Sequence, residues 1–256
     1  MSVRPAPISV QLYSLRDAAA VDFVRVLEQL GEVGFVGVEL AGFHGLQPKE
    51  FARIALRCGL VVSSGHIGDA APEGLEASLD GLQAAGCDTA VVAFLPPAAF
   101  ADLDAVQQSA DRVIAAYEAA SRRGMTVGYH NHWWEFETII EGRTAWQHLF
   151  ERLPADVFAE LDLYWATVGG ADAAQLLADH AQRIRILHVK DGPGADPKAA
   201  MVAVGSGSLD IAGIVQAGPR VAWHVVELDR CDTDMFTAIE ASYEYLVGNR
   251  LSAGRR

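Results

Sequence analysis

Side chains suited to acid–base chemistry or metal binding recur at intervals along this chain, each group after a short apolar run. In chain order the groups are Gln11 with Tyr13, Glu39, His66, His130 with His132, Glu160 with Asp162, His188 with Lys190 and Asp191, and Glu227 with Asp229. Such residues are costly to bury, so their place at the ends of apolar runs indicates a shared polar site.

Carboxylates that converge on one histidine predict a divalent-metal site. Asp162, Glu227 and a third carboxylate would repel one another unless a cation lay between them. The third is a glutamate that follows the fifth apolar run, and His188 adds an imidazole. Oxygen ligands with one imidazole fit Mn²⁺, Mg²⁺ or Co²⁺ better than a sulfur-seeking ion, with Zn²⁺ as a further alternative. Among these we expect Mn²⁺.

Eight short apolar runs alternate with eight longer amphipathic stretches, which is typical of parallel strands joined by crossover helices. The strands are expected at Ile8–Tyr13, Val36–Leu40, Leu60–Ser64, Thr89–Phe94, Met125–Asn131, Val157–Asp162, Ile184–Val189 and Val221–Leu228. The helices are expected at about 21–33, 48–58, 74–86, 101–123, 143–153, 172–182, 208–217 and 233–247. Eight such units without a long detour favour a closed barrel over an open doubly wound sheet. The sequence therefore predicts an α/β fold, a single (β/α)₈ TIM barrel that forms one domain over residues 1–256.

In such a barrel the carboxyl ends of all strands converge on one mouth, where active sites are built. Side chains two residues apart on a strand share a face. The same-face pairs are His130 with His132, Glu160 with Asp162, His188 with Lys190, and Glu227 with Asp229. Either member of a pair could point inward.

The overall composition restricts the possible partners. Of 256 residues, 51% are hydrophobic, enough for a substantial core, and the formal net charge is −13. This charge disfavours nucleic acids and anionic membranes, and the three scattered cysteines predict no disulfide framework or thiolate zinc site. No apolar run is long enough to span a membrane, and no signal-peptide core stands near the first residue. We expect a cytoplasmic protein that acts on a small molecule and forms a homodimer.

Six segments resemble the sugar phosphate isomerase/epimerase family, which has a xylose isomerase-like barrel. They are LYSLRD, VELAG, GYHNHWWEFE, ELDLYW, LHVKD and VVELD, and they span nearly the whole chain. The resemblance implies a metal ion held by Glu135, Asp162, His188 and Glu227. In the epimerases the strand-five glutamate lies within the strand, where this chain has YHNH, so Glu137 and His130 stay alternatives to Glu135.

The resemblance also implies isomerase or epimerase chemistry on a sugar or keto-sugar, in which a proton next to a carbonyl is removed and returned through an enediolate. We expect Glu227 to carry the proton on one face of the substrate and Glu135 or His132 on the other. Lys190 would supply a positive charge near the enediolate oxygen. The residues expected to contact the substrate are His66, Tyr13, Glu39, His130, Trp133 and Trp165.

Two other functions fit the same residues. The same enolate can expel a β-substituent, so a lyase or dehydratase acting on an inosose or a 3-keto-glycoside is the first alternative, and a non-catalytic binding subunit is the second. Gly205-Ser-Gly207 stands where barrels of this class often bind phosphate, but no Lys or Arg lies beside it. We expect a turn there and a substrate that need not be phosphorylated.

Overall fold

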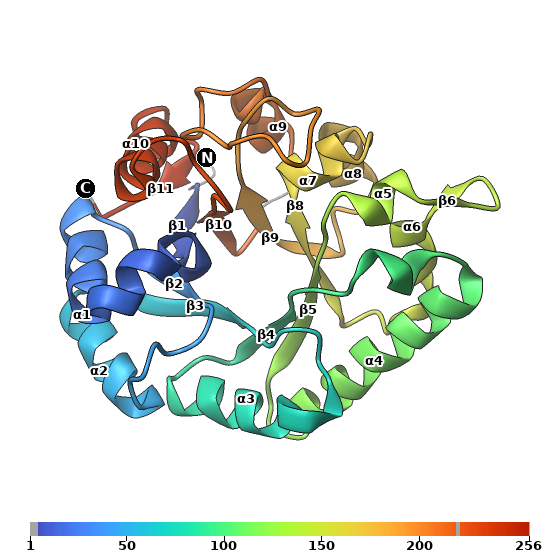
Figure 1. The fold of residues 1–256 in the computed structure, drawn as a ribbon, viewed down its shortest axis with the longest axis horizontal. Helices are drawn as coiled ribbons and strands as arrows, with labels where there is room; N and C mark the ends of the chain where they lie inside the picture. The colour runs from blue at the N-terminus through green and yellow to red at the C-terminus, as the bar shows by residue number, and fades with distance from the viewer. Residues whose placement is uncertain (1–4, 219–220, 256) are drawn as a thin grey trace.

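Eight parallel strands close into a barrel that is surrounded by helices (Figure 1). Each strand pairs with the next around the ring, and β10 pairs with β1 to close it. The barrel strands are β1 (Ala6–Gln11), β2 (Gly37–Leu40), β3 (Val61–His66), β4 (Thr89–Val92), β5 (Thr126–His130), β8 (Phe158–Asp162), β9 (Ile184–Val189) and β10 (Trp223–Val226). This computed structural model describes residues 5–218 and 221–255, so 1–4, 219–220 and 256, which belong to the predicted domain, lie outside the described residues. The predicted barrel is confirmed.

The longer helices lie close to their predicted positions. They are α1 (Arg16–Val33), α2 (Pro48–Arg57), α3 (Pro72–Ala84), α4 (Leu103–Ser121), α6 (Ala145–Arg152), α8 (Ala173–Asp179), α9 (Ile211–Ala217) and α10 (Met235–Gly248). α1 begins earlier than predicted and kinks at Asp22, whose carboxylate accepts a hydrogen bond from the backbone N–H of Arg25 at 2.9 Å. The predicted start near residue 21 is therefore this kink.

Several short elements were not predicted, because each is much shorter than the window of about 11–18 residues in which helical periodicity can be recognised or the run of about 4–8 alternating residues that indicates a strand. They are the 3₁₀ turns η1 (Leu12–Leu15) and η2 (Pro97–Phe100), the helices α5 (Trp134–Glu137) and α7 (Leu163–Val168), the hairpin of β6 (Ile139–Ile140) with β7 (Arg143–Thr144), and β11 (Ser252–Ala253). β11 pairs with β1, which brings the two ends of the described chain together (Figure 1). Among the described residues, no helix is both long and apolar enough to cross a membrane.

The inside of the barrel changes from apolar to polar toward the carboxyl ends of the strands. A small apolar cluster, separate from the main core, consists of Val91, Phe158, Ile186 and Val225. A Cβ on Gly128 would stand 2.4 Å from the Phe158 ring, so only glycine leaves room for this apolar floor. Glu160 follows Phe158 by two residues and shares its face, one layer nearer the mouth. His188 and Glu227 stand in the same relation to Ile186 and Val225, so the polar layer is built directly on the floor.

Candidate active site

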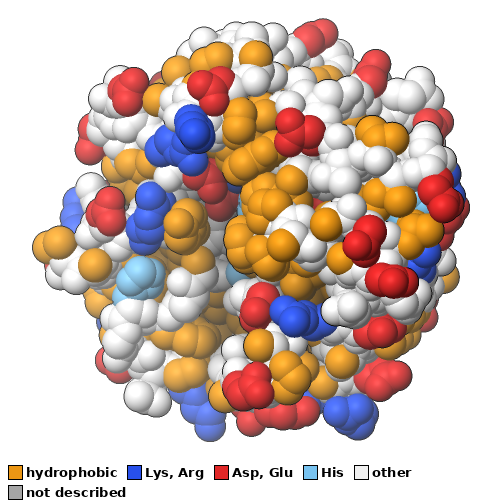
Figure 2. All heavy atoms as spheres, turned by 45° about the vertical axis from the view of Figure 1, so that its right-hand side comes forward, with side chains coloured by type: hydrophobic (Ala, Val, Ile, Leu, Met, Phe, Trp, Pro, Cys, Tyr) orange, Lys and Arg blue, Asp and Glu red, His pale blue; other side chains and the backbone are white. Residues whose placement is uncertain are grey.

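A cavity of about 530 Å³ opens at the carboxyl ends of the strands. Its walls are formed by Tyr13, Ala41, His66, Gly68, Ala93, Phe94, His130, His132, Trp133, Trp134, Trp165, Glu227, Asp229 and Arg230. Figure 2 shows hydrophobic side chains gathered around a hollow in which histidine atoms are visible. The short helices α5 and α7 carry aromatic residues to this wall, which can pack against the apolar faces of a sugar ring.

Four buried donors meet at the base of the cavity, namely His130, Asp162, His188 and Glu227, and their ligand atoms lie within 4.8 Å of one another. Nδ1 of His188 is 2.9 Å from Oε2 of Glu227. Nε2 of His130 is 3.8 Å from Oδ2 of Asp162. Ligands held about 2.0–2.2 Å from one ion lie roughly 3–3.5 Å apart, so this spacing suits a shared cation.

The two oxygens of the Asp162 carboxylate have different neighbours. Oδ1 accepts a hydrogen bond from the backbone N–H of Trp165 at 2.8 Å and so caps α7. Oδ2 is buried and faces the donor set, with Nζ of Lys190 at 3.0 Å. Burial raises the pKa of Asp162 to about 6. A buried carboxylate oxygen beside two imidazoles and a second carboxylate fits a divalent cation, so the cluster could hold a metal ion.

Lys190 places its ammonium group beside the same donors. Nζ lies 2.7 Å from Glu227, 2.7 Å from Asp229 and 3.0 Å from Asp162. Burial works against ionisation of Glu227, but Lys190 and His188 outweigh it and lower the pKa of this carboxyl well below its ordinary value. Glu227 is therefore ionised where it faces the cavity.

A second group of donors consists of His66, His130, Glu160 and His188, so it shares His130 and His188 with the first. Nε2 of His66 is 2.9 Å from Oε2 of Glu160 and 3.2 Å from Oε2 of Glu39. Burial lowers the pKa of His66, but these two carboxylates outweigh it and raise the pKa to about 10. His66 thus links two buried carboxylates as well as lining the cavity.

Glu135, predicted as the fourth ligand, lies outside both groups of donors. Its Oε1 accepts a hydrogen bond from the Tyr129 hydroxyl at 2.7 Å, and its Oε2 accepts one from the backbone N–H of His132 at 3.0 Å. Burial raises the pKa of Glu135 to about 8. The alternative Glu137 is exposed on α5, whereas His130 completes the donor set.

The other predicted residues fall into two places. Tyr13, His66, His130, His132, Trp133 and Trp165 line the cavity, together with Glu227. Glu39, predicted to contact substrate, is instead fully buried and is not among the residues that line the cavity. Its Oε1 accepts a hydrogen bond from Ser64 at 2.5 Å, and its Oε2 accepts one from Gln11 at 2.8 Å.

Sequence reasoning gave no role to three residues that shape the site. Glu160 stands two residues before Asp162 on the same face, and that spacing was a usable signal. The Asn131 side chain accepts a hydrogen bond from the backbone N–H of Asp162 and donates one to its carbonyl, at 3.0 and 3.2 Å, so it ties β5 to β8. Phe94 stands edge-on against His132, with ring centroids 5.4 Å apart.

The glycine turn at Gly205–Gly207 holds a carboxylate of the protein itself. Asp191 accepts hydrogen bonds from the backbone N–H groups of Gly205 and Gly207, each at 2.9 Å, and from that of Gly192 at 2.8 Å. These amides are the donors that would bind a phosphate in such a turn. Their use by Asp191 supports the expectation of a structural turn.

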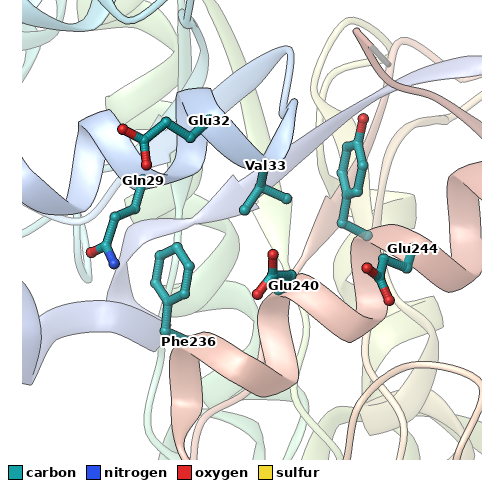
Figure 3. A pocket seen from close by; sticks show the side chains of 7 residues that line it. Gln29, Glu32, Val33, Phe236, Glu240 and Glu244 are labelled. Atoms are coloured by element: carbon teal, nitrogen blue, oxygen red, sulfur yellow. The ribbon is translucent and has the colours of Figure 1, made fainter.

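A second hollow lies on the outside of the barrel, between α1 and α10 (Figure 3). Its volume is about 510 Å³, and its lining residues are Gln29, Glu32, Val33, Phe236, Glu240, Tyr243 and Glu244. These side chains include three carboxylates but no imidazole or ammonium group that would complete an acid–base site. The cavity at the barrel mouth is therefore the candidate active site.

Comparison with solved structures finds the same fold in several proteins. A sugar phosphate isomerase/epimerase from Parabacteroides distasonis is 21% identical, with a TM-score of 0.82, over 98% of this chain and 97% of its own. The probable 3-DHS dehydratase AsbF from Bacillus anthracis is 15% identical, with a TM-score of 0.76, over 94% and 98%. An IolI protein with a bound zinc atom is 13% identical, with a TM-score of 0.74, over 95% and 98%.

The family comparison covers most of the sequence. The model of the xylose isomerase-like TIM barrel family matches residues 13–217, whereas no curated protein matches the chain. The match agrees with the closed ring of eight parallel strands and with the resemblance of the strand-end segments. This chain belongs to the xylose isomerase-like TIM barrel family.

Proposed function

We propose that this protein is a divalent-metal-dependent sugar or keto-sugar isomerase or epimerase that moves a proton next to a carbonyl. The observation that carries the proposal is the donor set of His130, Asp162, His188 and Glu227 at the base of an aromatic-walled cavity. When bound, the ion would supply positive charge that stabilises the enediolate oxygens. Mn²⁺ is the ion we propose, and the bound zinc of the IolI protein makes Zn²⁺ the first alternative.

Two residues on different sides of the cavity, Glu227 and His132, carry the proton in this proposal. Glu227 comes from the end of β10, is ionised and faces the cavity, so it accepts the proton from carbon. His132 follows β5, three places away around the barrel, and burial lowers its pKa to about 3, so its imidazole is neutral. It serves as the second proton carrier. Glu135 holds the backbone of His132 in place.

Lys190 and the aromatic residues orient the substrate. Lys190 keeps its charge between Asp162 and Glu227, next to the place where the enediolate forms. Trp133 and Trp165 have ring centroids 4.8 Å apart and form one apolar wall for the sugar ring. A cytoplasmic location and a homodimer belong to the same proposal and stay predictions.

Elimination is the second candidate, and the size of the cavity favours it. Pockets of about 300–1,000 Å³ bind drug-sized ligands, and 530 Å³ leaves room for a substituent beyond a single sugar ring. Phe94 is 45% exposed at the mouth and offers an apolar surface to such a group. Proton removal by Glu227 would then expel the β-substituent instead of returning a proton.

Solvent-deuterium exchange tests both candidates. The metal-loaded protein is incubated in D₂O with ketoses, inososes and 3-keto-glycosides, and mass spectrometry follows each product. Deuterium on the carbon next to the carbonyl in an isobaric product supports isomerisation, whereas loss of water or aglycone supports elimination. Turnover without exchange and without intramolecular proton return would overturn the enediolate route.

A further inference from the structure

The His188 ring lies between Glu227 on one side and two buried carboxylates on the other. Its Nδ1 faces Glu227 at 2.9 Å within the donor set, and its Nε2 faces Glu39 at 2.6 Å and Glu160 at 3.2 Å, which together form the buried carboxylate layer. A neutral imidazole carries a proton on one nitrogen and a lone pair on the other. If Nε2–H donates to Glu39, then Nδ1 presents its lone pair to the donor set.

His130 also lies between two carboxylates, that of Glu160 in the buried carboxylate layer and that of Asp162 in the donor set. Its Nδ1 is 3.2 Å from Oε2 of Glu160, and its Nε2 points toward Oδ2 of Asp162 at 3.8 Å. The first distance is that of a hydrogen bond, whereas the second leaves space for an ion. Both histidines therefore present one nitrogen to the donor set and the other to the buried carboxylate layer.

The carboxylate layer is itself held in place. Glu39 accepts hydrogen bonds from Gln11 and Ser64, and both donors are buried. The N–H at Nε2 of His66 lies within reach of both Glu39 and Glu160. These contacts hold the Glu39 carboxylate next to His188. Among the residues that contact Glu39, His66 also lines the cavity.

We propose that Glu39 and Glu160 are positioning residues, which set the ring nitrogen that His188 and His130 present to the metal ion. The inference rests on the proposed metal-dependent function and goes beyond it, because neither carboxylate belongs to the four-residue donor set. Carboxylates behind metal-bound histidines fix the tautomer and the ring orientation, and their loss costs about 10–100-fold in metal affinity. Glu39 faces His188, whereas Glu160 faces both His130 at 3.2 Å and His188 at 3.2 Å, so the two carboxylates act on one connected network.

Co²⁺ binding to the purified, metal-free chain tests this inference. Co²⁺ is titrated while its visible absorption spectrum reports both affinity and ligand geometry. Glu39→Gln is expected to bind Co²⁺ about 10–100-fold more weakly, with an altered spectrum at saturation, because the amide N–H₂ can face Nε2 and drive the proton onto Nδ1. Ser63→Ala is the matched control, since Ser63 is buried in the barrel and hydrogen-bonds with Ser9 rather than with either histidine.

Glu39→Asp separates position from charge. Aspartate keeps the negative charge but is one methylene shorter, so it does not reach Nε2 of His188, and we expect weak Co²⁺ binding as in Glu39→Gln. Binding of Glu39→Asp at wild-type affinity would show that charge alone matters and would overturn the positioning role. Glu160→Gln removes the carboxylate that faces both His130 and His188, so it should weaken Co²⁺ binding as well, and it carries the test if circular dichroism shows that the Glu39 variants do not fold.

The remaining outcomes separate this inference from the function on which it rests. The double variant Glu39→Gln/Glu160→Gln should bind Co²⁺ more weakly than either single variant, and its loss should differ from the product of the two single losses because both carboxylates face Nε2 of His188. If the wild type binds Co²⁺ and the Gln variants bind it with the same affinity, the positioning role of Glu39 and Glu160 is overturned while the proposed function stands. A wild-type protein that binds no divalent ion would overturn both.

Discussion

Nζ of Lys190 lies 2.7 Å from Oε2 of Glu227, so a buried ammonium group borders the proposed metal ligands. The same nitrogen contacts Asp162 and Asp229, and the Lys190 side chain is 1% exposed. One cation cannot neutralise three carboxylates in a buried site. Lys190 and a divalent ion are therefore expected to stabilise the same negative charges.

The variant Lys190→Met removes this cation with little change in volume. The carboxylates lose their buried partner, so we expect the metal-free protein to lose about 3–5 kcal/mol in its free energy of unfolding. A bound ion would offset part of the loss, which should be smaller in saturating Mn²⁺ than in EDTA. Urea unfolding under both conditions measures the two values, and equal losses would contradict a shared role in charge compensation.

Glu227→Gln keeps the shape of the side chain and removes its charge. Since Glu227 is the ionised carboxylate that faces both the donor set and the cavity, turnover should fall by at least about 10²–10⁴-fold while the circular dichroism spectrum is unchanged. Steady-state rates on the substrate found by deuterium exchange give the comparison. Glu151→Gln is the control, because this exposed glutamate pairs only with Arg143 in the hairpin before α6. Wild-type turnover in Glu227→Gln would remove it from the mechanism.

Metal affinity also decides between His130 and Glu135 as the fourth ligand. His130→Ala removes a donor from the set and should weaken Mn²⁺ binding by more than about 100-fold, which exceeds the roughly 10–100-fold cost of losing a carboxylate behind a metal-bound histidine. Glu135→Gln should bind Mn²⁺ as the wild type does, because both oxygens of Glu135 are used by Tyr129 and the His132 backbone. Calorimetric titration of the two variants measures this, and the opposite order would restore Glu135 as the ligand.

The fold and three residues of the proposed donor set could be predicted because they depend on strand alternation. Asp162, His188 and Glu227 each stand at a fixed even spacing from an apolar residue on the barrel floor, so their inward direction follows from the period of two. The same rule would have identified Glu160. Its contact with His66 on β3 could not be predicted, because contacts across the barrel depend on how the barrel closes.

The region after β5 could not be predicted in the same way. The strand ends at His130, so alternation does not extend to His132 or Glu135, and a four-residue helix sets their directions instead. The hydrogen bonds from the glycine turn to Asp191 could not be predicted either, because the donating backbone amides lie 14 and 16 residues after Asp191 in the sequence. Such contacts depend on the folded path of the loop rather than on residue type.

His224 provides a pH test of the fold away from the metal site. Its side chain is buried on β10, and Nδ1 lies 2.8 Å from the Ser252 hydroxyl on β11. Burial lowers the pKa of His224 to about 4 from an ordinary value of 6.5. As the pH falls from 6.5 to 4, the unfolded chain binds a proton that the folded protein does not bind, so stability falls. At about 1.4 kcal/mol per pKa unit the loss is roughly 3 kcal/mol.

Replacing His224 with glutamine isolates this contribution from all other titrating groups. The variant lacks the imidazole, so the wild type should lose roughly 3 kcal/mol relative to it between pH 6.5 and pH 4. Ser252→Ala removes the hydrogen bond but leaves the imidazole buried, and it should keep the pH dependence of the wild type. Urea unfolding at several pH values measures all three proteins. Parallel curves for the wild type and His224→Gln would mean that His224 is protonated in the folded protein, and that the strand pairing of β11 with β1 does not exclude water from it.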